Sequence, residues 1–108
     1  MIPIYNFPDH IKGDTIPAKK IIFGFDLTGA IIKMNFKTQV NSKVAFFWST
    51  VDNSIVVTNP VNGEVTINAK KIDVAPAAYV YDVQITFADG RNKTYFNGTI
   101  TIVQDITE

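Results

Sequence analysis

The 108-residue chain contains no cysteine, one leucine and two glutamates. The absence of cysteine excludes disulfides, thiol catalysis and metal sites built on thiolates. Leucine and glutamate favour helices, so their scarcity argues against a helical fold. The chain instead contains 15 isoleucines, 11 valines and 11 threonines, which are residues enriched in strands. This composition predicts an all-β protein.

A surplus of positive charge is also absent, because ten basic side chains are balanced by ten acidic ones. Nucleic acids and anionic membrane surfaces attract proteins with excess lysine and arginine, so neither is expected as a partner. The sequence lacks the run of about 20 apolar residues that a membrane-spanning helix needs, and it does not begin with a basic segment followed by an apolar one. We therefore expect a soluble protein without a signal peptide, folded as a single domain over residues 1–108.

Apolar and polar residues alternate over several short segments, as they do in strands that bury one face. The clearest case is 79–87, where every second residue is apolar or aromatic. An Asp-Gly pair follows within 88–92, and it supplies the positive φ angles of a tight hairpin turn. The second arm of this hairpin is expected over 93–103, with Gly98 marking a bulge or close packing.

Similar short strands, separated by turn residues, number seven or eight along the chain. This pattern predicts an immunoglobulin-like sandwich of two antiparallel sheets, with a small barrel as the alternative. Pro17 interrupts the segment 15–25, which is therefore expected to form an edge strand or a kinked strand. The segment 70–77 is expected to form a short helical turn or a loop.

Four aromatic residues admit two interpretations. In the structural one, Trp48 packs between the two sheets, while Tyr79 and Tyr81 begin a core strand, as in a tyrosine corner whose hydroxyl binds a nearby backbone group. In the other, these three residues and Tyr95 form a surface on which sugar rings stack. The second interpretation would make the protein a carbohydrate-binding module.

Chemistry that would support catalysis is sparse in this sequence. His10 is the single histidine, and it is expected to be a surface or capping residue because no activated nucleophile accompanies it. Asp9, His10 and Asp14 are too few and too loosely placed to predict a metal site. We expect no enzymatic activity, no catalytic residue, no cofactor and no metal.

Exposed apolar side chains are the better indication of a binding surface. Five residues fall on the outward positions of their strands: Ile31, Phe47, Val80, Tyr95 and Val103. The first four are the candidate partner contacts, because an apolar patch on a sheet face is typical of a protein interface. Asp82 also faces outward, where it is expected to be solvated or to pair with Lys33 or Lys93.

Four stretches together resemble a known family. They are Lys12-Gly13-Asp14-Thr15-Ile16-Pro17, Asp26-Leu27-Thr28-Gly29-Ala30 with the following Ile31-Ile32-Lys33-Met34, the segment 59–67 that begins Asn-Pro-Val-Asn-Gly, and the segment 79–90 that ends Ala-Asp-Gly. Their order, closed by Gly98-Thr99-Ile100-Thr101-Ile102 and Asp105-Ile106-Thr107, resembles the immunoglobulin-like N-terminal domain of phage upper baseplate proteins. The resemblance covers about residues 11–107.

This resemblance implies a structural module of a phage or prophage tail tip or baseplate, which helps to assemble the apparatus of host adsorption. The implied partners are other tail and baseplate proteins, or further copies of the chain. The implied location is the virion tail, or the cytoplasm of the bacterial host before assembly. The alternative function is a module that binds carbohydrate or another cell-surface polymer.

Overall fold

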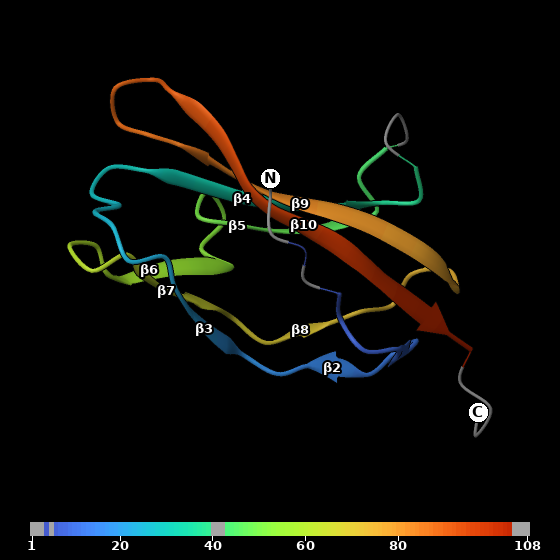
Figure 1. Ribbon diagram of the computed structural model, residues 1–108. Helices are drawn as coiled ribbons and strands as arrows, with labels where there is room; N and C mark the ends of the chain where they lie inside the picture. The colour runs from blue at the N-terminus through green and yellow to red at the C-terminus, as the bar shows by residue number, and fades with distance from the viewer. Residues whose placement is uncertain (1–3, 5, 40–42, 105–108) are drawn as a thin grey trace.

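The structure is a computed structural model that describes residues 4, 6–39 and 43–104 (Figure 1). These residues form ten strands and no helix, namely β1 (His10–Ile11), β2 (Thr15–Ile16), β3 (Lys19–Ile22), β4 (Ile31–Lys37), β5 (Phe46–Ser49), β6 (Ile55–Asn59), β7 (Glu64–Ile67), β8 (Lys70–Lys71), β9 (Ala77–Thr86) and β10 (Asn92–Val103). The predicted all-β class is therefore confirmed. In these ranges the structure contains no helix that could span a membrane.

The strands pack as two layers with the core between them (Figure 1). One layer is a five-stranded sheet in the order β1-β10-β9-β4-β5, and the other holds the sheet β3-β7-β6 with the short pair β2-β8. β1 runs parallel to β10, whereas all other pairs are antiparallel. The two-sheet sandwich was predicted, but the predicted number of seven or eight strands was too low. Three of the observed strands have only two residues each, which is too short for a sequence pattern to indicate.

The inner faces of β4 and β9 form the centre of the core, as their alternation predicts. The inward residues are almost fully buried: Ile32, Met34, Phe36, Tyr79, Tyr81, Val83 and Ile85. Phe36 stacks between Phe46 and Tyr81, with ring centroids 4.4 and 4.6 Å away. Trp48 is also buried, and its indole N–H donates a hydrogen bond of 2.8 Å to the carbonyl oxygen of Asn68. The prediction that Trp48 packs between the sheets is confirmed.

Tyr79 adopts the geometry expected of a tyrosine corner. Its hydroxyl donates a hydrogen bond of 2.6 Å to the carbonyl oxygen of Ala75, four residues earlier. Burial raises the pKa of the phenol above its ordinary value, so the protonated donor form is favoured in the folded chain. This hydrogen bond therefore fixes the position of the chain where it enters β9.

The β9–β10 hairpin forms as predicted, with Gly90 at a φ of 92° in its turn. The bulge lies elsewhere than expected, because the register shifts between Thr94 and Phe96 and leaves Tyr95 as the extra residue. Gly98 pairs regularly with Tyr81, so the prediction of a bulge at Gly98 was wrong. A bulge reverses the alternation of side chains on one side of it. This reversal changes which face the side chain of Tyr95 occupies.

The less regular segments also differ in part from expectation. Pro17 divides 15–25 into β2 and β3, and β3 lies at a sheet edge as predicted. The segment 70–77 holds β8, a loop over 72–76 and the first residue of β9, so no helical turn forms and the alternative of a loop holds in part. Residues 105–107, which close the family resemblance, lie outside the described residues.

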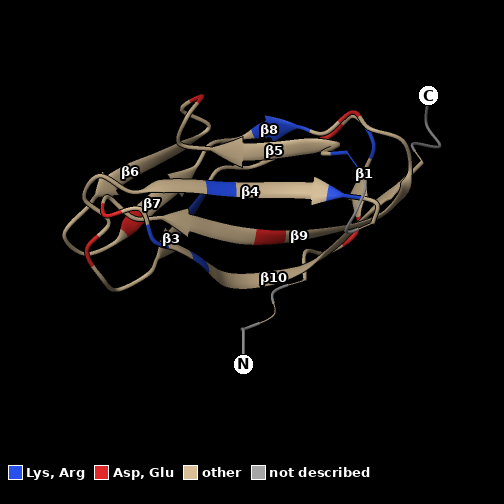
Figure 2. Ribbon diagram, turned by 90° about the horizontal axis from the view of Figure 1, so that it is seen from above, with Lys and Arg blue, Asp and Glu red and all other residues tan. Residues whose placement is uncertain are grey.

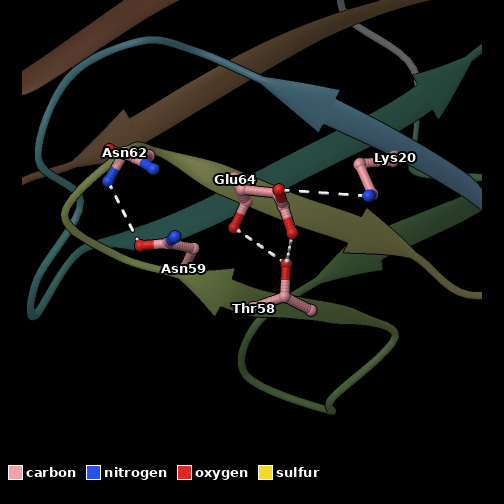
Figure 3. Close-up of polar contacts among 5 residues, drawn as sticks. All are labelled: Lys20, Thr58, Asn59, Asn62 and Glu64. Atoms are coloured by element: carbon pink, nitrogen blue, oxygen red, sulfur yellow. Dashed lines mark hydrogen bonds and ion pairs between the residues drawn. The ribbon is translucent and has the colours of Figure 1, made fainter.

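The turn between β6 and β7 is held by side chains from three strands (Figure 3). The hydroxyl of Thr58 donates to the Glu64 carboxylate at 2.9 Å, and the other carboxylate oxygen lies 4.0 Å from the Lys20 ammonium. The N–H of Asn62 donates to the side-chain oxygen of Asn59. Gly63 follows with a φ of 72°, which places it in the left-handed region as the Asn-Gly sequence predicts.

Ser54 caps the exposed edge of β5. In the β4–β5 ladder the N–H of Thr50 donates to the carbonyl oxygen of Ile32. Hydrogen-bonded and non-hydrogen-bonded pairs alternate along an antiparallel ladder, so the backbone N–H and C=O of the preceding residue, Ser49, point away from β4. The Ser54 hydroxyl oxygen accepts the Ser49 N–H at 2.8 Å and donates to the Asp52 carboxylate at 2.6 Å. This cap satisfies a backbone donor that would otherwise be open to another chain.

We expect Ser54→Ala to lower the free energy of unfolding by about 1–2 kcal/mol, because the N–H of buried Ser49 loses its partner. The hydrogen bond from the Ser54 hydroxyl lowers the pKa of Asp52, so in the variant this pKa should rise toward the ordinary value of an aspartate. Urea unfolding measures the first effect and NMR titration the second. Thr58→Ala is the control, since it removes a hydrogen bond from an exposed hydroxyl and should cost less than about 0.5 kcal/mol. Equal losses in the two variants would contradict the cap.

Candidate functional site

The structure places three of the four predicted contact residues on the outer face of the five-stranded sheet. Ile31 and Phe47 are 41% and 40% exposed, and Val80 is half-buried. They do not form one patch, because Ile31 lies opposite Thr86 while Val80 lies six residues along the same strand, about 20 Å away. The Phe47 ring is covered on one side by the Lys70 ammonium, 5.6 Å from its centroid.

The prediction that Tyr95 faces outward was wrong. The bulge turns Tyr95 toward the interior together with Phe96, and its ring lies 5.0 Å from Phe25 and 6.0 Å from Phe23. Phe87 joins this aromatic group at one end of the sandwich. Strict alternation therefore fails at Tyr95, because a single extra residue shifts the parity of the strand.

The aromatic surface proposed for sugar stacking is also not formed. Trp48, Tyr79 and Tyr81 are 1%, 2% and 4% exposed, so their rings cannot meet a ligand. Their structural interpretation holds instead, because they contact one another through Phe36 and Phe46 in the core. Any carbohydrate site on this protein must use other residues.

Sequence reasoning missed a hollow of about 580 Å³ on the outer face of the five-stranded sheet. Its floor contains Asn35 of β4, Asp82 of β9 and Asn97 of β10, which lie opposite one another in the strand register. Lys37 and Val80 line it beside this row. Figure 2 shows this face, with acidic and basic positions on neighbouring β9 and β4. Alternation did predict that these side chains point outward, but only the register brings them together.

The N-terminal segment forms one wall of the hollow. Ile4 pairs in parallel with Asn97, and the side-chain oxygen of Asn6 accepts hydrogen bonds from the N–H and the hydroxyl of Thr99, at 3.1 and 3.3 Å. The N–H of Phe7 donates to the carbonyl oxygen of Thr99. These contacts cover the free edge of β10 and raise a rim above the sheet face.

Asp82 contacts neither of its two predicted partners. In the register it faces Asn35 and Asn97, and no ion pair joins it to Lys33 or Lys93 within the part of the chain that the structure describes. The expectation of an ion pair was therefore wrong, because the pairing places amides rather than lysines beside the carboxylate. Its exposure agrees with the alternative of a solvated side chain.

His10 is half-buried, and its Nε2 atom lies 2.9 Å from the carbonyl oxygen of Asp14. This contact agrees with the predicted capping role, since the ring ties β1 to the turn that follows it. Over residues 4, 6–39 and 43–104, no group of three or more histidine, aspartate or glutamate side chains is arranged to hold a metal ion.

A second surface follows from the chain between β5 and β6. β5 is an edge strand of the five-stranded sheet and β6 is an edge strand of the three-stranded sheet. Three exposed apolar residues belong to this consecutive stretch: Phe47, Val51 and Val56, which are 40%, 70% and 40% exposed. Two sheet edges and their apolar side chains therefore lie along one side of the sandwich.

No protein-family model, no curated protein and no solved structure matches this chain. Its function must therefore be argued from its own residues and surfaces. The two surfaces that the geometry offers are the β5–β6 edges and the hollow over β4, β9 and β10.

Proposed function

We propose that the protein is a non-enzymatic docking module of a phage or prophage tail tip or baseplate, which helps to assemble the host-adsorption apparatus. Two arguments support this function. The first is the resemblance of residues 11–107 to the immunoglobulin-like N-terminal domain of phage upper baseplate proteins. The second is the pair of adjacent open sheet edges on β5 and β6, which suits contact with another protein.

The β5 edge is the observation on which this proposal depends. Ser54 closes the edge at Ser49, but Phe47 has the same backbone orientation two residues earlier, and no described residue pairs with its outer side. A partner strand could therefore bind the backbone at Phe47. The exposed side chains of Phe47 and Val51 would add apolar contact area.

The proposal is tested by isolating tail particles from the organism that encodes this chain and searching them for the protein by mass spectrometry. The purified protein is also mixed with the tail-tip proteins encoded beside it, and complexes are measured by size-exclusion chromatography with light scattering. We expect the protein in the particles and a defined complex in solution. Absence from the particles together with no complex would sink the proposal.

Phe47→Asp tests whether the β5 edge makes the contact. We expect at least about tenfold weaker complex formation, because a carboxylate would be desolvated in the interface. Ile11→Asp is the matched control, since Ile11 is 43% exposed but lies on β1, at the opposite edge of the same sheet. If the two variants bind equally well, the docking surface is not the β5 edge.

A further inference from the structure

The row at the floor of the hollow brings three planar polar side chains together. Asn35, Asp82 and Asn97 occupy directly opposite positions on three adjacent strands. Such positions place successive Cβ atoms about 5 Å apart. The row therefore runs straight across the sheet, with the side chains of Lys37 and Gln84 lining the hollow beside it.

None of these three side chains forms a hydrogen bond or an ion pair with another residue that the structure describes. Each amide offers both a carbonyl acceptor and an N–H₂ donor, and the carboxylate offers only acceptors. Asn35 and Asn97 are half-buried, and their side-chain amides have no hydrogen-bond partner among the residues that the structure describes. The row thus presents alternating donors and acceptors to whatever occupies the hollow.

The lining excludes several ligand classes. One lysine and one aspartate leave no net charge to hold a phosphate or another anion. At the hollow, β4 and β9 are paired on both sides and the N-terminal segment lies along the outer edge of β10, so these backbones are not available to an added peptide strand. The Tyr81 ring stacks on Phe36 in the core and offers no platform for a nucleobase.

We propose that this hollow binds a neutral saccharide, with the Asn35–Asp82–Asn97 row hydrogen-bonded to neighbouring sugar hydroxyls. Hydroxyls both donate and accept, which matches a row of amides around a carboxylate. Val80 and Ile4 provide apolar surface for the C–H face of the ring. The volume of about 580 Å³ lies within the range of small-ligand sites. Phe47 of the β5 edge lies opposite Asn35 in the register but does not line the hollow, so this proposal rests on other residues than the proposed docking function.

The test is an NMR titration of the ¹⁵N-labelled protein with glucose, galactose, rhamnose and N-acetylglucosamine, and with disaccharides of each, at millimolar concentrations. We expect at least one of these probes to shift the side-chain amide signals of Asn35 and Asn97 in a saturable manner. Disaccharides that bind more tightly than their monosaccharides would identify a glycan chain as the source of the ligand. Inorganic phosphate and adenosine serve as the charged and aromatic probes.

Asp82→Ala is expected to weaken the binding of that saccharide about tenfold or more, because the charged acceptor at the centre of the row is lost. Asn35→Ala should weaken it in the same direction, which keeps the test intact if one variant folds poorly. Thr66→Ala, on β7 of the opposite sheet, is the control and should bind as the unchanged protein does. The proposal is overturned if no saccharide gives saturable shifts in the row, if Asp82→Ala binds equally well, or if only phosphate or adenosine binds there.

Discussion

Phe36→Ala should lower the free energy of unfolding by about 3–5 kcal/mol. The Phe36 side chain has no exposed surface, and it stacks on Phe46 and Tyr81 while meeting Trp48 edge-on at 5.5 Å. Removing the ring loses the free energy gained by burying it away from water. It also loses the contacts of the ring with its neighbours, because the surrounding strands can collapse only partly into the cavity. A loss of this size is a large share of the 5–15 kcal/mol that typically stabilises a domain.

Urea unfolding followed by tryptophan fluorescence measures this effect, because Trp48 is the single tryptophan and lies beside the substituted ring. Phe47→Ala is the matched control on the neighbouring strand β5, where the Phe47 ring is 40% exposed. This substitution should lower the free energy of unfolding by less than about 1 kcal/mol. A similar loss in both variants would show that the assignment of inner and outer faces is wrong.

Gly63→Ala should produce the second large loss, at about 3 kcal/mol or more. The φ of 72° alone costs an L-residue about 1–2 kcal/mol. A Cβ atom at this position would also lie near the backbone of Phe25, which cannot move aside as a flexible side chain could. The turn between β6 and β7, or the chain near Phe25, would have to shift to admit the methyl group.

Gly90→Ala separates these two contributions. Gly90 has a similar positive φ of 92°, but a Cβ built there meets no atom within 4 Å. Gly90→Ala should therefore cost only the conformational strain, about 1–2 kcal/mol. Thermal and urea unfolding of both variants provide the comparison, and equal losses would mean that the approach to Phe25 contributes nothing.

The two candidate surfaces differ in how far sequence reasoning could reach them. The outward positions of Ile31, Phe47 and Val80 followed from alternation, because successive side chains of a strand always point to opposite faces. Their separation on the sheet did not follow, since it depends on which residue lies opposite which. The hollow was missed for the same reason, although the outward direction of Asp82 was predicted.

The wrong prediction for Tyr95 shows a second limit of structure prediction from the sequence. A bulge adds one residue to one strand, and the decision is made by pairing with the neighbouring strand rather than by the local sequence. Gly98 carried the usual local signal for a bulge, yet it pairs regularly with Tyr81. The aromatic group that receives Tyr95 is assembled from segments far apart in the chain, so no local pattern indicated it.

The amino-acid sequence by itself determined the all-β class, the hairpin over 79–103 and the positive-φ turn at Gly90. It offered the core placement of Trp48 and Tyr79 as one of two interpretations. These features depend on side-chain period and backbone preference, which act over a few neighbouring residues. The tertiary structure alone decided the register, the bulge, and the course of Ile4 and Asn6 along β10. These features depend on contacts between segments that are distant in the chain. Each such contact is weak, and only their sum favours one arrangement of the strands over another. The scarcity of leucine and glutamate thus predicted an all-β protein, while the pairing of its strands created the surfaces on which its proposed functions rest.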